Sequence, residues 1–291
     1  MTYRPRHRQR RRGGCFMRVI TFLLLIALLA YPFLEPFMLE TETVSLTSSH
    51  LPRDIGQVRV AYLSDIHAGP FFSQSRVEKL ISTVNRLNAD IVLLGGDYAN
   101  DCEGAIDFFK HMPRLNSRYG VYAVMGNHDR TIPEGNLFNL KSAMISSGVT
   151  PLVNDVASVR IGASNIYLAG IDDVDNGWPN ISEVAAQVRQ EDYVIFLSHS
   201  PAAVAEAHKA KDMNGRNMWF DLGLFGHTHG GQLAFFGGLL QDDGVDDQYR
   251  SGWLRQNRTD LLISRGVGTT VLPVRLFCRP QIHLITINST R

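Results

Sequence analysis

Cysteine is scarce in this sequence, with only three among 291 residues, which excludes a disulfide-scaffolded fold. Cys102 and Cys278 are nevertheless able to pair in an oxidising compartment.

Acidic residues are absent from residues 1–18, which hold seven of the 29 basic residues; the other 273 residues carry 22 basic and 28 acidic side chains, a net charge of −6. A body without excess positive charge lacks the basic face that sequence-independent DNA binding needs. Hydrophobic residues at 44% and charged residues at 20% exclude a disordered or collagen-like chain.

One uncharged apolar run follows the basic tail. Residues 19–34 reach about 24 Å as a helix, at roughly 1.5 Å per residue, and residues up to 39 extend the run toward the roughly 30 Å of a bilayer core. We expect residues 19–39 to be a membrane anchor because no small-residue cleavage site follows; a cleaved signal peptide or an apolar helix packed on the domain are the alternatives. The positive-inside rule then places residues 1–18 in the cytoplasm and the body outside. The alternative is a peripheral anchor on the cytoplasmic face.

Residues 40–57 are polar and predict a linker or a leading strand, after which one domain occupies residues 58–291. Apolar runs typical of strands alternate with helical spacings of apolar residues in the first half of this domain. A predicted hairpin and several further strands make up the second half. This order predicts an α/β fold in which two sheets pack together, with helices outside.

Five of the apolar runs end in short polar segments. These segments carry carboxylate, carboxamide or imidazole side chains, mostly with glycine beside them: Asp65-Ile66-His67, Gly96-Asp97, Gly126-Asn127-His128-Asp129, His199 and Gly226-His227-Thr228-His229. Sites in α/β sheets form outside the carboxyl ends of strands, so we expect the five loops to converge on one crevice. A lone Asp-x-His motif occurs mostly by chance. Five polar segments in succession, each at the end of an apolar run, indicate a site.

The residue types in these loops suit metal binding. Mixed oxygen and nitrogen ligands favour manganese, iron or zinc over calcium. In an extended segment, the alternation in Asp65-x-His67 and His227-x-His229 places both side chains of each pair on one side. A single carboxylate such as that of Asp97 is able to bridge two ions about 3.5–4 Å apart.

With these motifs the sequence resembles the calcineurin-like metallophosphoesterase superfamily, whose ordered blocks are Asp-x-His, Gly-Asp, Gly-Asn-His-Asp/Glu, a lone His and Gly-His-x-His. The match spans about residues 58–231. Residues 266–280, together with the apolar N-terminal segment, more weakly resemble its small membrane-associated bacterial phosphodiesterase-like members.

The resemblance implies a four-layer α/β/β/α sandwich with two divalent metal ions. By motif, one ion would be held by Asp65, His67 and His229, and the other by Asn127, His199 and His227. Asp97 would bridge the two ions. His128 would be the catalytic histidine, acting as general acid or electrostatic stabiliser, and Asp129 would orient it.

The implied reaction is phosphoester hydrolysis by metal-activated hydroxide. We favour a phosphodiesterase acting on a lipid-linked or nucleotide-linked phosphodiester, since the anchor would confine the site to the bilayer surface. Among the arginines of the last quarter, Arg275 is the expected substrate contact. The alternatives are a phosphomonoesterase or phosphoprotein phosphatase, or a non-catalytic metal-binding scaffold of the same fold.

Overall fold

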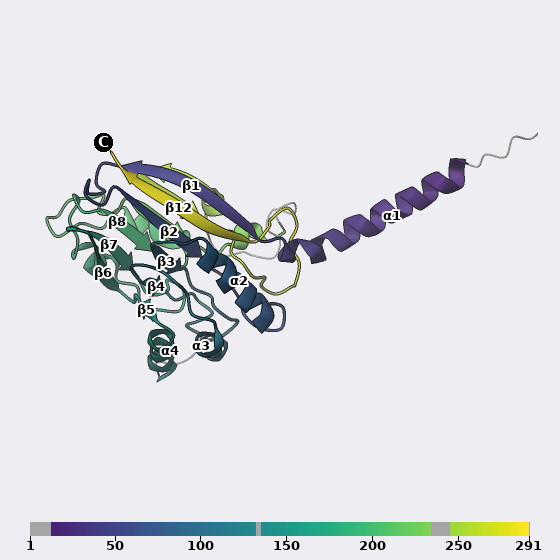
Figure 1. Ribbon diagram of the computed structural model, residues 1–291, viewed down its shortest axis with the longest axis horizontal. Helices are drawn as coiled ribbons and strands as arrows, with labels where there is room; N and C mark the ends of the chain where they lie inside the picture. Colours follow the sequence, from purple (N-terminus) through teal and green to yellow (C-terminus); the bar gives the residue numbers. More distant parts are fainter. Residues whose placement is uncertain (1–12, 132–134, 234–244, 291) are drawn as a thin grey trace, which may run out of the picture.

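The computed structural model describes residues 13–131, 135–233 and 245–290. The predicted basic tail therefore lies largely outside the described residues. Helix α1 (Gly13–Leu34) is a 22-residue apolar helix that projects away from the rest of the chain (Figure 1). Residues 16–37 are long and apolar enough to cross a membrane; residues 16–34 are exposed or half-buried, and only Glu35 and Pro36 at the end of this span are buried against the domain. The structure thus does not show the alternative of an apolar helix packed on the domain.

Two six-stranded mixed sheets lie face to face, and α1 projects from one end of them (Figure 1). The first sheet has the order β1 (Glu40–Ser48), β12 (Gln281–Ser289), β2 (Gln57–Leu63), β3 (Ile91–Leu94), β4 (Val121–Ala123) and β5 (Val149–Pro151). The second has the order β10 (Gly252–Gln256), β11 (Thr259–Ile263), β9 (Leu222–Phe225), β8 (Val194–Leu197), β7 (Ser164–Gly170) and β6 (Asp155–Ile161).

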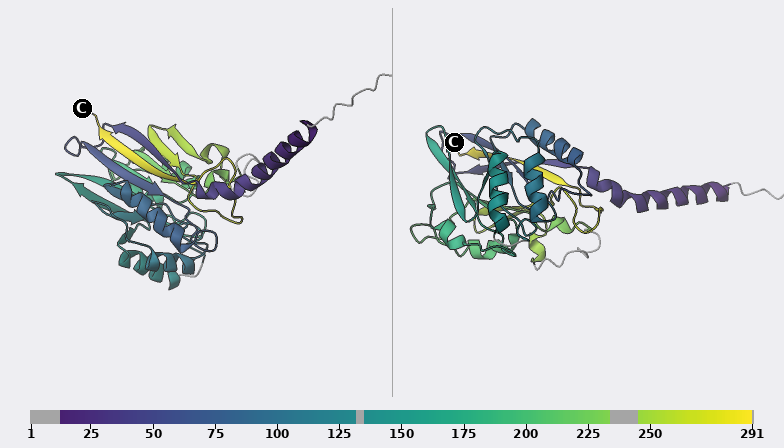
Figure 2. Two further views of the ribbon diagram at one scale, coloured as in Figure 1. Left: turned by 45° about the vertical axis from the view of Figure 1, so that its right-hand side comes forward. Right: turned by 90° about the horizontal axis from the view of Figure 1, so that it is seen from below.

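Helices cover the outer face of each sheet. The first sheet is covered by α2 (Gln74–Arg86), α3 (Cys102–His111) and α4 (Gly135–Ser146), of which α3 and α4 lie side by side in Figure 2. The second is covered by α5 (Ile181–Ala185) and α6 (Val204–Ala207). Short 3-10 turns complete the fold: Glu35–Phe37, Pro201–Ala203, His229–Gly231 and Asp247–Tyr249. The predicted four-layer α/β/β/α sandwich is confirmed.

The core consists of three apolar layers. One lies between the sheets, where Leu93 and Leu197 are fully buried, and the other two lie between each sheet and its helices. Helix α2 illustrates how the sequence dictates this packing, because its buried residues Val77, Leu80, Ile81 and Val84 recur at three- and four-residue spacing. Each such side chain contributes about 1.5–3 kcal/mol when it is fully buried.

Residues 40–48 are not a linker. They form β1, which pairs in parallel with β12 from Glu40 opposite Gln281 to Ser48 opposite Ser289. Their side chains alternate between exposed and half-buried, as befits an edge strand. The alternative of a leading strand therefore holds for this part of residues 40–57.

Candidate metal centre

The five polar loops meet, as predicted, at one edge of the sandwich. Strands β2, β3 and β4 are parallel neighbours, and so are β8 and β9, so that within each sheet the strands end side by side. Every loop starts within a few residues of its strand's end: Asp65 follows β2, Asp97 follows β3, Asn127 follows β4, His199 follows β8 and His227 follows β9.

The backbone of these loops is left-handed rather than extended. Positive φ angles occur at Asp65 (54°), His67 (48°), Asp97 (55°), His227 (70°) and His229 (49°). The prediction that Asp65-x-His67 and His227-x-His229 are extended, with both side chains of each pair on one side, is therefore wrong. A left-handed non-glycine residue costs about 1–3 kcal/mol and persists only where the surroundings fix it, which is typical of functional sites.

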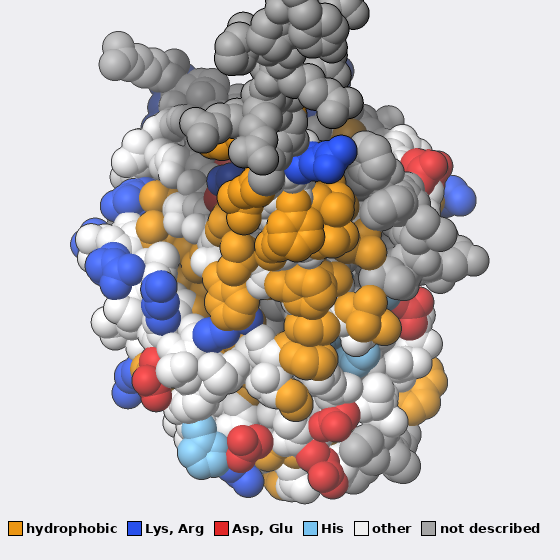
Figure 3. All heavy atoms as spheres, turned by 90° about the vertical axis from the view of Figure 1, so that its right-hand side faces the viewer, with side chains coloured by type: hydrophobic (Ala, Val, Ile, Leu, Met, Phe, Trp, Pro, Cys, Tyr) orange, Lys and Arg blue, Asp and Glu red, His pale blue; other side chains and the backbone are white. Residues whose placement is uncertain are grey.

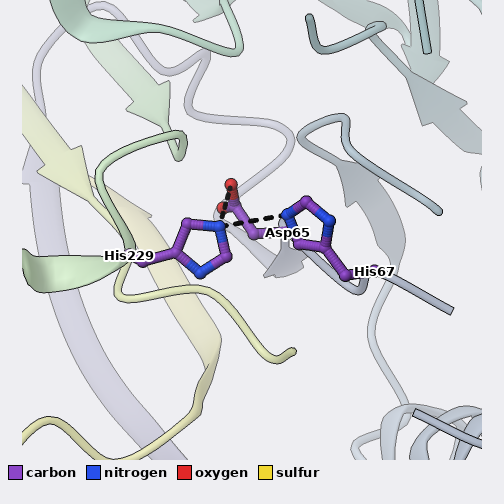
Figure 4. A group of neighbouring side chains, drawn as sticks. All are labelled: Asp65, His67 and His229. Carbon is purple, nitrogen blue, oxygen red and sulfur yellow. Dashed lines mark hydrogen bonds and ion pairs between the residues drawn. The ribbon is translucent and has the colours of Figure 1, made fainter. Parts of the chain in front are cut away.

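Asp65, His67 and His229 form the first cluster, shown in Figure 4. The Nε2 atoms of the two histidines are 3.1 Å apart, and Nε2 of His229 lies 3.6 Å from Oδ1 of Asp65. Burial lowers the pKa of both histidines, so both rings are neutral at pH 7 and offer a lone pair. Three ligand atoms thus converge from loops after β2 and β9.

Asp97 lies between the first cluster and the second. Its Oδ2 is 3.6 Å from Nε2 of His67 and 3.2 Å from Nε2 of His199. Burial alone would raise the pKa of Asp97, but the adjacent imidazoles of His199 and His67 lower it well below its usual value. One ionised oxygen therefore faces both predicted metal positions, the placement that a bridging carboxylate requires.

We use the term second cluster for Asn127, His199 and His227, in which the ring centres of the two histidines are 5.2 Å apart. Nδ1 of His227 and Oδ1 of Asn127 are 3.1 Å apart. Nδ1 of His199 lies 2.8 Å from the carbonyl oxygen of Gly95, to which it donates, and this hydrogen bond turns Nε2 toward Asp97. Such an outer partner fixes the tautomer of a metal-binding histidine.

The clusters fit divalent cations. Oδ2 of Asp65 is buried without a hydrogen-bond partner among the described residues, and the Nε2 atoms of His67 and His229 lie 3.1 Å apart beside this carboxylate. Buried polar atoms are rarely left in this way, and a cation between them would satisfy all three. The carboxylate, imidazole and amide donors match manganese, iron or zinc.

His128 lies beside the first cluster, with its ring centre 4.9 Å from that of His67. Asp129 does not orient it. The carboxylate of Asp129 instead accepts hydrogen bonds from the backbone N–H groups of Asp97 and Gly126, each at 2.8 Å. It therefore ties together the loops that follow β3 and β4.

Asn100 performs the orienting role that was expected of Asp129. Its carbonyl oxygen lies 3.0 Å from Nδ1 of His128, and its side-chain Oδ1 lies 3.0 Å from Nδ1 of His67. Sequence reasoning missed Asn100, because an asparagine three residues after Gly-Asp has no distinctive spacing. Asn100 reaches the two histidines only because the loop after β3 folds back toward His67.

Arg275 does not face the site. It is fully buried, and its guanidinium donates to the carbonyl oxygens of Arg265, Gly268 and Cys278 at 2.6–3.0 Å. The expected substrate contact is thus corrected: these donors hold together the loop over residues 265–278. Cys102 and Cys278 are buried and unpaired, and the thiol of Cys278 lies 3.1 Å from the carbonyl oxygen of His229.

Comparison with known proteins identifies the family of this chain. Residues 58–231 match the family described as calcineurin-like phosphoesterase. The chain is 28% identical over 268 residues to the metallophosphoesterase YkuE of Bacillus subtilis, covering 89% of this chain and 88% of that protein. It is 30% identical over 270 residues to a transmembrane protein with metallophosphoesterase domain of Bos taurus, covering 82% of this chain and 55% of the relative. Among solved structures, phosphopantetheinyl hydrolase (PptH) of Mycobacterium tuberculosis superposes with a TM-score of 0.41 at 10% identity, over 77% of this chain and 98% of that one. The chain belongs to the calcineurin-like phosphoesterase family, and it carries a buried cluster of histidine and aspartate residues suited to metal ions.

Proposed function

We propose that this chain is a dinuclear metal-dependent phosphodiesterase. The observation that carries the proposal is the position of Asp97, whose Oδ2 faces one histidine of each cluster, His67 and His199. One ion would be held by Asp65, His67 and His229 and the other by Asn127, His199 and His227, with Asp97 shared. When bound, such cations supply Lewis-acid stabilisation of phosphoryl oxygens and lower the pKa of coordinated water.

His128 is the proposed proton donor to the leaving oxygen. Because Nδ1 of His128 faces a carbonyl oxygen, it must carry the hydrogen, so Nε2 is the atom that gains and loses a proton. Imidazole is the side chain best suited to proton transfer near neutral pH. Asn100 supports this role by fixing the ring.

A diester fits the charges near the site better than a monoester does. Both buried arginines that the structure describes form other contacts. Arg275 donates to backbone carbonyl oxygens, and Nη2 of Arg130 lies 3.1 Å from Oδ2 of Asp172. A monoester dianion gains more from free guanidinium groups than a singly charged diester does. This supports a phosphodiester over the phosphomonoesterase alternative.

We also propose that α1 anchors the chain in a membrane with the catalytic domain outside. The apolar window of residues 16–37, and the description of the bovine relative as a transmembrane protein, support the anchor. Reporter fusions to the C-terminus test the side: alkaline phosphatase should be active and a green fluorescent protein dark. The reverse pattern would favour the cytoplasmic-face alternative.

The activity test uses the full chain in detergent, stripped of metal and supplied with manganese, zinc or iron(II). We expect hydrolysis of bis-p-nitrophenyl phosphate in excess of p-nitrophenyl phosphate, with loss of at least 100-fold in Asp97→Asn. The matched control is His111→Gln, an exposed histidine on α3 away from the clusters. Preference for the monoester would support a phosphomonoesterase, and metal binding without turnover of either ester would support the scaffold alternative.

A further inference from the structure

Exposed hydrophobic side chains gather where α1 leaves the domain. We define the apolar collar as Phe37, Met38, Phe71, Val271 and Leu272, whose exposed fractions run from 38% to 72%. Figure 3 looks at the face from which α1 projects, so the hydrophobic side chains in its centre include those of α1 itself, and charged side chains lie mostly toward the periphery. Exposed apolar side chains so grouped mark a contact surface.

The collar is tied to the end of α1. Arg76 donates to the carbonyl oxygens of Phe71 and Pro36, and its guanidinium lies 4.5 Å from the centre of the Phe37 ring. These contacts join the loop before α2 to the segment that follows α1. The contacts of Arg76 therefore fix the positions of Phe37, Met38 and Phe71 relative to α1.

The loop that carries Val271 and Leu272 is fixed to the same joint. The carboxylate of Glu35, fully buried, accepts hydrogen bonds from the backbone N–H groups of Phe277 and Cys278. The N–H of Arg275 donates to the carbonyl oxygen of Pro32 at 2.9 Å. The domain is thus held at the end of α1 through several contacts rather than through a flexible linker.

We infer that the apolar collar lies in the interfacial layer of the same bilayer that α1 enters, an inference that rests on the proposed anchor. The apolar span of residues 16–37 ends three residues after α1, at Phe37, which is itself a collar residue, so the collar continues the apolar surface at the point where the helix ends. Arg76 and Lys79, which line a groove of about 280 Å³ beside Phe37, add positive charge that suits lipid phosphates.

This placement brings the metal centre to the membrane surface. Phe71 lies four residues after the predicted ligand His67. The side chain of Gln232, three residues after His229, donates to the carbonyl oxygens of Thr270 and Leu272 at 3.0 Å. Two ligand loops thus run directly into the collar. The substrate class that follows, if the proposed function holds, is an amphipathic phosphodiester whose apolar part stays in the bilayer.

Spin labels on the full chain test the inference. Cys15 is replaced by serine, and single cysteines at Phe71 and Val271 carry a nitroxide in vesicles of phosphatidylethanolamine and phosphatidylglycerol. Leu25 on α1 is the lipid reference and Phe138 on α4, exposed at 74%, is the water reference. We expect the ratio of oxygen to nickel-chelate accessibility at positions 71 and 271 to exceed that at 138 at least tenfold and to approach that at 25.

The two relaxing agents separate the outcomes. A ratio at 71 and 271 within twofold of that at 138 would place the collar in water and overturn the inference. Low accessibility to both agents would show a second copy of the chain covering the collar, which also overturns it. A water-exposed label at position 25 would refute the anchor, and the inference with it.

An activity assay tests the substrate class separately. The double variant Phe71→Ser, Val271→Ser should lose at least fivefold on hexadecyl p-nitrophenyl phosphate in vesicles and stay within twofold on bis-p-nitrophenyl phosphate in solution. Equal changes on both substrates would refute the membrane-embedded substrate. If the unmodified chain hydrolyses neither diester, the proposed function fails, while the spin labels still decide whether the collar contacts lipid.

Discussion

Glu35 provides a direct test of the joint between α1 and the domain. Its carboxylate accepts two backbone hydrogen bonds in a fully buried position, and Glu35→Ala removes both. A hydrogen bond to a charged group contributes about 1.5–3 kcal/mol, so the lower figure gives a loss of about 3 kcal/mol in the free energy that keeps this joint closed. Since about 1.36 kcal/mol corresponds to a factor of ten, local opening should increase about 150-fold.

The thiol of Cys278 reports this opening, because it is 1% exposed and reacts only when the joint opens. The assay is the rate of iodoacetamide labelling at Cys278, followed by peptide mass spectrometry. The matched control is Glu40→Ala, which removes an exposed ion pair to Arg279 and should change the rate less than threefold. An increase below tenfold in Glu35→Ala, or one no larger than in the control, would refute the reasoning.

Three further outcomes are expected. Asn100→Ala should weaken metal binding and lower kcat by about 10–100-fold, because the partner of His67 is lost, and unchanged values in metal titration and kinetics would count against this role. The carboxylate of Asp212 accepts hydrogen bonds from several N–H groups, which lower its pKa from 3.8 to about 2. Its contribution to the stability of the folded chain is therefore full above pH 4 and is lost as the pH falls through 2. In urea unfolding, the deficit of Asp212→Asn should therefore be larger at pH 6 than at pH 3, and an equal deficit would contradict the assignment. Gly226→Ala places a methyl group against Oδ2 of Asp65, so metal-dependent activity should fall at least tenfold while the circular dichroism spectrum stays unchanged. Full activity would contradict this prediction, because it would show that the loop moves to accommodate the methyl group.

The sequence predicts well what depends on local pattern. Buried runs such as residues 91–94 and 194–197 indicate strands, and the polar residues that follow them indicate the site, because strand ends and their loops are adjacent in the chain. The predicted ligands Asp65, Asp97 and His199 could thus be grouped from their positions in the chain alone.

What the sequence does not predict depends on distant segments. Strand β1 has an alternating polar pattern whose partner, β12, lies at the other end of the domain. Arg275 has the chemistry of a phosphate ligand, but the carbonyl groups that it satisfies belong to a loop conformation that no spacing encodes. Likewise, Asn100 contacts His128 in place of Asp129, whose carboxylate binds backbone N–H groups instead, because of how two loops approach each other.

The pairing of β1 with β12 sets an order of events during synthesis. Glu40 and Gln281, which face each other in the sheet, are about 240 residues apart in the chain. At roughly 5–20 residues per second, β12 leaves the ribosome about 12–48 s after β1. Throughout that interval α1 is already available to the membrane while β1 has no partner and the first sheet is incomplete. If α1 enters a membrane as we propose, its insertion therefore precedes completion of the first sheet.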